Sequence, residues 1–157
     1  MKTFNLKLVQ GEKYMNNITK MKILKPANEV FEAFVEPSKI GNFWFSSSSE
    51  RWEQGKTITL RYDEYDAKGD IKIIEIELNK KIVFHWGVNT EGNRVTITLN
   101  ELGISESIIE ITEEGFNENE ENIISQMLDN KEGWVYMLTC LKGYLEYGVK
   151  LRASLIH

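Results

Sequence analysis

In the middle of the chain, apolar and polar residues alternate with a period of two. Ile58, Leu60 and Tyr62, for example, alternate with polar neighbours. The same pattern recurs in segments 71–78, 82–86 and 95–99 and in one that ends near residue 112. Such alternation is typical of half-buried antiparallel strands, because successive side chains point to opposite faces. Turn-forming residues separate these segments, at 66–70, 79–81, 91–93 and 101–103. The pattern therefore predicts an antiparallel meander.

Two further strands and two helices are predicted before the meander. Alternation predicts a main strand over residues 17–24 and a short strand around Phe4 and Leu6. Pro26 suits the first position of a helix, where its missing N–H costs nothing. Apolar residues then recur at spacings of three and four, namely Ala27, Val30, Phe31 and Phe34. Pro37 starts a second, shorter helix, and serines 46–49 are expected to form a polar linker.

The C-terminal region changes to a helical period. Its apolar stripe consists of Trp134, Leu138, Leu141 and Leu145. With Asp129 or Asn130 as N-cap, the helix is expected to begin near Lys131 and to run for roughly 20 residues, or about 30 Å. The predicted fold class is α+β, with a curved antiparallel sheet that grips this helix. We expect one domain over residues 1–157, with an N-terminal extension of residues 1–14 and a core of residues 15–152.

The acidic charge excludes some classes of partner. The net charge is −5, and residues 113–122 contain five glutamates and no basic residue. An acidic chain without a basic stripe should repel phosphate backbones, so no nucleic-acid partner is expected. We interpret residues 113–122, from Glu113 to Asn122, as a solvated connection, because blocks of like charge are usually exposed.

We expect a cytoplasmic protein that does not enter a membrane. No apolar run approaches the roughly 20 residues that cross a bilayer, and residues 1–7 lack the apolar core of a signal peptide. Cys140 is the single cysteine, so the chain cannot form an internal disulfide, which fits a reducing compartment. At 157 residues, the chain can bury a core without a metal or a disulfide.

Large aromatic residues are the candidate ligand-binding residues. They either line a pocket and stack on a flat or apolar ligand or simply fill the core, since both roles use the same residue types. The candidate ligand-binding set is Trp44, Phe45, Tyr62, Phe84, Trp86, Trp134, Leu138 and Leu141. Arg61 adjoins Tyr62 but points to the opposite face of a regular strand, so we favour Tyr62.

No catalytic residue or cofactor is predicted. By strand alternation, His85 faces away from the predicted cavity. Cys140 has no base nearby to activate it. Glu75, Glu77 and Glu110 are expected to point outward, although a buried carboxyl could act as a base. No group of residues has the spacing of metal ligands.

Several segments together resemble the START-like (Bet v 1-like, SRPBCC) superfamily. The matching segments are residues 23–31, Pro37 with Trp44, residues 52–55, residues 81–86, and Gly133-Trp134 with the leucines after them. Within this superfamily, the chain looks most like the domain family of the activator of the Hsp90 ATPase. The resemblance implies a helix-grip fold with a hydrophobic cavity. Members of the superfamily bind lipids or aromatic polyketides or act as cyclases, and many have no assigned ligand.

The leading hypothesis is a binding protein for a hydrophobic or aromatic small molecule, held between the sheet and the last helix. One alternative is a cyclase- or hydrolase-type enzyme that uses the same cavity, which would need an ionisable residue facing inward. Another is an interaction or co-chaperone-like module of the Hsp90-activator type. Homodimerisation through a sheet edge or an apolar helix surface is left open.

Overall fold

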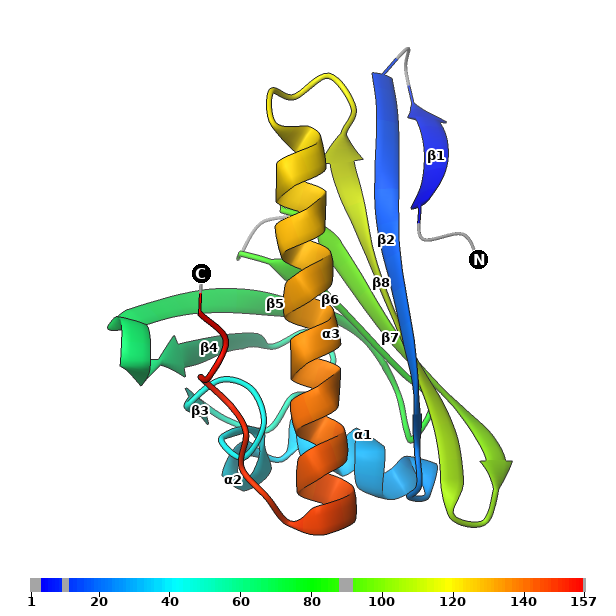
Figure 1. Ribbon diagram of the computed structural model, residues 1–157, viewed down its shortest axis with the longest axis vertical. Coiled ribbons are helices and arrows are strands. Elements are labelled where there is room, and N and C mark those ends of the chain that lie inside the picture. The colour runs from blue at the N-terminus through cyan, green and yellow to red at the C-terminus, as the bar shows by residue number, and fades with distance from the viewer. Residues whose placement is uncertain (1–3, 10–11, 88–91, 157) are drawn as a thin grey trace.

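The computed structural model describes residues 4–9, 12–87 and 92–156 (Figure 1). Within these residues, an eight-stranded sheet has the strand order β1-β2-β8-β7-β6-β5-β4-β3, and all neighbouring strands are antiparallel. In chain order the elements are β1 (Phe4–Val9), β2 (Glu12–Ile23), α1 (Ala27–Val35), α2 (Pro37–Ile40), β3 (Ser47–Ser48), β4 (Thr57–Tyr62), η1 (Asp63–Tyr65), β5 (Ala67–Glu77), β6 (Lys81–Trp86), β7 (Arg94–Gly103), β8 (Glu106–Asn117) and α3 (Ile123–Tyr147).

The α+β helix-grip fold is confirmed. The long helix α3 crosses the concave face of the curved sheet, and α1 and α2 cover one end of it (Figure 1). The expected N-terminal strand is present as β1, which pairs with β2. The boundary expected between extension and core, at residues 14 and 15, stays a prediction, and β2 runs through it. None of the helices in the described part of the chain is long and apolar enough to cross a membrane.

The last helix begins eight residues earlier than predicted. Its first residue is Ile123, so Asp129 and Asn130 lie within the helix and do not cap it. The early turns are stabilised by a small apolar cluster, in which Ile123 and Met127 pack with Phe116 of β8. At 25 residues, α3 is about 37 Å long. It ends at Gly148, whose φ of 69° is readily adopted by glycine and reverses the chain.

Four local predictions are corrected. Pro26 has a ψ of 154° and is the N-cap of α1, so it is not the first helical residue. The serine linker contains β3, which pairs with β4. The chain reverses at residues 63–66, before the predicted turn, and β5 already begins at Ala67. β7 runs through the predicted turn at residues 101–103. The turn expected at residues 91–93 lies partly outside the described residues.

The interpretation of residues 113–122 as a solvated connection is wrong at its start. β8 continues to Asn117, so Glu113 and Glu114 belong to the strand. Glu113 is only 3% exposed and faces α3, whereas residues 118–122 are exposed. A glutamate at a sheet position under a helix is buried by the packing of that helix, which the local sequence does not show.

The main core lies between the sheet and the helices. The apolar face of α1 predicted from its spacing is buried, and Phe34 there has an exposed fraction of 0%. Its ring packs edge-on against Phe43, with 5.2 Å between ring centroids. This contact places the aromatic segment after α2 against the inner face of the sheet and so positions Trp44.

Candidate functional site

A cavity of about 260 Å³ lies beside α3, between the helix, the segment after α2, strands β4 and β6, and the C-terminal segment. Its described lining residues are Phe43, Trp44, Tyr62, Tyr65, Trp86, Asn130, Gly133, Trp134, Tyr136, Met137, Arg152, Ala153 and Leu155. The wall is mainly aromatic and aliphatic, which is typical of a pocket for a small organic molecule.

Three indole rings form the aromatic wall. The Trp44 and Trp134 centroids are 5.5 Å apart, and Trp86 lies 6.4 Å from each of them. Separate elements position the rings. The backbone N–H of Trp44 donates to the Ile40 carbonyl at 3.0 Å, which continues the turn of α2. Trp86 ends β6 on the same face as the buried Phe84.

Four of the eight predicted ligand-binding residues line the cavity: Trp44, Tyr62, Trp86 and Trp134. Phe45 lies next to this wall and packs on Trp44 and Tyr62, at centroid distances of 4.7 and 5.6 Å. The other three, Phe84, Leu138 and Leu141, are fully buried in the core and are not among the lining residues. The ligand-binding role of the eight stays a prediction.

Several lining residues are absent from the set predicted from sequence. Asn130, Gly133 and Met137 share one face of α3 with Trp134, since they follow one another at spacings of three and four. Gly133 and Met137 already lie within the predicted helix, and correct placement of the helix start would have added Asn130 by period. Tyr65, Arg152 and Leu155 carry no such signal, because they lie in a turn and in the segment after the last helix.

Gly133 widens the cavity at the helix surface. It lies in the interior of α3, where glycine costs about 1 kcal/mol relative to alanine. A Cβ atom at this position would meet no atom within 4 Å. Neither its backbone nor close packing therefore requires glycine here, and its effect is to leave space at the cavity.

A buried carboxylate supports the helix side of the cavity. Glu113 Oε1 accepts hydrogen bonds from Trp134 Nε1 at 3.0 Å and Asn130 Nδ2 at 2.9 Å. Glu113 Oε2 accepts one from Asn93 Nδ2 at 2.9 Å. Asn130 Oδ1 in turn accepts from Asn17 Nδ2 at 3.0 Å. This network ties β2, β8, α3 and the residue before β7 together and orients two of the lining residues, Trp134 and Asn130.

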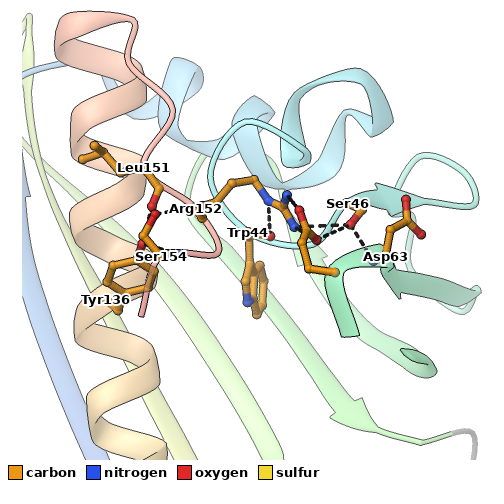
Figure 2. A network of polar contacts seen from close by, with 8 residues as sticks. Trp44, Ser46, Asp63, Tyr136, Leu151, Arg152 and Ser154 are labelled. Atoms are coloured by element: carbon orange, nitrogen blue, oxygen red, sulfur yellow. Dashed lines mark hydrogen bonds and ion pairs between the residues drawn. The ribbon is translucent and has the colours of Figure 1, made fainter. Parts of the chain in front are cut away.

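At the opposite side, Arg152 joins the C-terminal segment to the segment after α2 and to η1 (Figure 2). Its Nε donates to the Trp44 carbonyl at 2.8 Å, and its Nη2 donates to Ser46 Oγ at 3.2 Å. Nη1 and Nη2 donate to the two Glu64 carboxylate oxygens at 2.5 and 2.9 Å. The guanidinium also lies 5.2 Å from the centre of the Tyr62 ring.

The ion pair between Arg152 and Glu64 lowers the pKa of the Glu64 carboxyl. Hydrogen bonds from Arg152 are the main cause that lowers the pKa of Glu64 from 4.5 to about 2. The lowered pKa means that the stability contributed by this carboxylate is complete above pH 4.5 and is lost as the pH falls toward 2. In Arg152→Ala, we expect the pKa of Glu64 to rise from about 2 toward its ordinary value of 4.5, as measured by NMR titration of the Glu64 side-chain carbon. A Glu64 pKa near 2 in that variant would contradict the assignment.

The other candidates for chemistry do not line the cavity. His85 Nδ1 contacts the Gly92 carbonyl at 3.2 Å, and Glu75 pairs with Lys81 at 2.9 Å. Cys140 is fully buried, and burial raises the pKa of its thiol. None of these is among the described lining residues. No group of three or more His, Cys, Asp or Glu in the described part of the chain could hold a metal ion.

The fold and the cavity define the class as START-like, a sheet gripping one long helix over an apolar pocket. A family model described as "Activator of Hsp90 ATPase homolog 1-like protein" matches residues 25–146. The chain belongs to this family, which confirms the resemblance seen in the sequence. No curated protein sequence matches the chain.

Solved structures share the fold. Protein SSP2350 from Staphylococcus saprophyticus is 53% identical with a TM-score of 0.78, and the match covers 88% of this chain and 96% of that one. DynU16, described as a protein of the dynemicin biosynthetic locus, is 20% identical with a TM-score of 0.73, over 86% of this chain and 48% of that one. The Aha1 dimer from Colwellia psychrerythraea is 19% identical with a TM-score of 0.73, over 85% of this chain and 97% of that one. At these identities, the last two show the fold alone.

Proposed function

We propose that this protein binds a hydrophobic or aromatic small molecule in the cavity between the sheet and α3. The observation that carries the proposal is the wall of three indole rings around a space of about 260 Å³. Large aromatic faces contribute apolar contact area and stack on flat molecules. The volume lies just below the roughly 300–1,000 Å³ usual for ligand pockets, so we expect a ligand of one or two rings.

The polar groups of the wall favour a ligand that carries hydrogen-bond acceptors. The indole N–H of Trp134 already donates to Glu113, and Arg152 is paired with Glu64. Trp44 and Trp86 are half-buried, and no hydrogen bond from either indole N–H to a described residue is found. A carbonyl or ether oxygen on a planar ring would satisfy these donors.

Binding is better supported than acid–base catalysis. A cyclase or hydrolase of the kind considered above needs an Asp, Glu, His or Lys in contact with the cavity. The described lining residues supply asparagine, tyrosines and a paired arginine instead. Nothing in the site specifically favours the interaction-module alternative, and we therefore propose binding alone.

The proposal is tested with the neutral fluorescent probe N-phenyl-1-naphthylamine. We expect the probe to bind with enhanced fluorescence and Gly133→Phe to weaken its binding at least tenfold, because the added ring enters the open space at Gly133. Glu132→Phe is the matched control, since it adds the same ring to an exposed position of α3 that does not line the cavity. Its affinity should stay within twofold of the wild type.

Circular dichroism and urea unfolding establish that both variants are folded before affinities are compared. The proposal is wrong if the wild-type protein does not bind the probe, or if Gly133→Phe and Glu132→Phe bind it equally well.

A further inference from the structure

The chain does not end at the last helix. After Gly148, residues 149–156, named here the strap, turn back and run beside α3 toward β4 (Figure 1). Arg152, Ala153 and Leu155 of the strap form part of the cavity wall. The strap lies beyond residues 25–146, the part matched by the family model. One side of the cavity is therefore closed by a segment outside the matched domain.

Few contacts hold the strap in place, and they lie at separate points. Val149 and Leu151 pack over Gly143, where a Cβ atom would lie 3.2 Å from Val149 Cγ2 and 3.0 Å from Leu151 Cδ1. The Tyr136 hydroxyl donates to the Leu151 carbonyl and accepts from the Ser154 N–H (Figure 2). No residue of the strap belongs to a strand or helix. Apart from the hydrogen bond from Val149 N–H to the Gly143 carbonyl at 3.3 Å, its attachment depends on contacts made by side chains.

Arg152 makes the most extensive of these contacts. Its side chain is 13% exposed, whereas its partner Glu64 is 40% exposed and reaches water. Because Arg152 Nε donates to the carbonyl of Trp44, the same residue links the strap to the aromatic wall of the cavity. Loss of this one side chain would remove the hydrogen bonds that join the strap to the segment after α2 and to η1.

The backbone between these contacts is strained. Ala153 has a φ of 61°, in the left-handed region that residues other than glycine rarely adopt. This conformation is unfavourable for such a residue and persists only where surrounding contacts impose it. Arg152 on one side and the Ser154 N–H on the other supply such contacts. When they break, relief of the strain favours the released strap.

We propose that residues 149–156 are a gate, which opens to admit the ligand to the cavity beside α3 and closes over it, with Arg152 as its latch. This inference rests on the proposed binding function. The gate opens by local release of the strap, while the sheet and α3 stay folded, since no sheet pairing has to break.

Cys140 is a native reporter of this opening. It is the only cysteine in the chain and is fully buried. The Tyr136 side chain, one turn earlier on α3, lowers the pKa of the Cys140 thiol against the effect of burial, and its hydroxyl also holds Leu151 and Ser154 of the strap. We expect release of the strap to free Tyr136 and to expose the thiol to solvent. The rate at which N-ethylmaleimide labels Cys140 in the folded protein therefore measures strap opening without any ligand.

We expect Arg152→Ala and Glu64→Gln each to accelerate Cys140 labelling at least tenfold at pH 7.5. Arg51→Ala is the matched control, because it removes another arginine–glutamate pair, with Glu32 at 2.8 Å, that involves no residue of the strap. Its labelling rate should stay within twofold of the wild type. Equal labelling rates in all four proteins, or an acceleration that only follows each variant's loss of global stability in urea, would overturn the gate.

Stopped-flow binding of N-phenyl-1-naphthylamine then tests whether the gate is the route to the cavity. The probe is neutral, so removal of the Arg152 charge does not by itself alter its attraction. We expect both association and dissociation to accelerate at least fivefold in Arg152→Ala and Glu64→Gln. Faster labelling with unchanged probe kinetics would refute the gate as the entry route. Absence of probe binding in every protein would instead refute the proposed function, and Cys140 labelling would still decide whether the strap opens.

Discussion

Replacement of Glu113 by alanine is expected to lower the free energy of unfolding by about 3–5 kcal/mol. The carboxylate is 3% exposed and accepts three hydrogen bonds, from Trp134, Asn130 and Asn93. Hydrogen bonds to a charged group contribute about 1.5–3 kcal/mol each, and a buried donor left without a partner costs about 1–3 kcal/mol. Relief from burying the carboxylate offsets part of this loss. Urea unfolding followed by circular dichroism measures the change.

Glu114→Ala is the control for this prediction, because Glu114 is the next residue of β8, on the opposite face of the strand. It should change the stability by less than 1 kcal/mol. Because Glu113 orients Trp134 and Asn130, Glu113→Ala should also weaken binding of N-phenyl-1-naphthylamine. A stability loss below 1 kcal/mol in Glu113→Ala would show that the network contributes little to the fold.

Phe34→Ala is expected to destabilise the protein by a similar amount, about 3–5 kcal/mol. Phe34 is fully buried on α1, with its ring 5.2 Å from Phe43 and 6.1 Å from Trp44. Removal of the ring loses its transfer free energy and leaves a cavity that the rigid core only partly fills. The midpoint of urea unfolding should fall without a change in slope.

Phe34→Leu separates loss of volume from loss of the aromatic contacts. It retains most of the apolar volume, so we expect a smaller loss, about 1–1.5 kcal/mol. Equal stability of Phe34→Ala and Phe34→Leu would contradict the prediction that the empty space left by the ring destabilises the core. Since Phe34 supports Trp44, the alanine variant should also broaden the Trp44 side-chain NMR signals.

Part of the site could be predicted from sequence because regular elements fix the direction of their side chains. Tyr62 shares a face with the buried Leu60 and lines the cavity, while Arg61 points away and is exposed. The same alternation kept His85 out of the cavity. Alternation shows which face of the sheet a side chain is on, but not whether it is buried in the core or reaches the cavity. Phe84 and Trp86 share one face of β6, yet only Trp86 reaches the cavity.

The start of α3 and the role of Glu113 were misjudged for one reason. Both depend on contacts between elements, such as Ile123 and Met127 with Phe116, or Glu113 with Trp134 across 21 residues of sequence. A local window of sequence contains no information on such partners. For this reason residues 113–122, which are rich in glutamate, were predicted to be a solvated loop, although Glu113 lies beneath α3.

By itself, the sequence determined the α+β helix-grip class, the family and most of the aromatic wall. These follow from local periodicity and from the residue types that periodicity places on one face. Only the tertiary structure decided that the wall is completed by the segment after the last helix. The pairing of Arg152 with Glu64 joins residues 88 positions apart, in a turn and a segment without any period. Such a contact exists only because the sheet and α3 hold both ends of it in place.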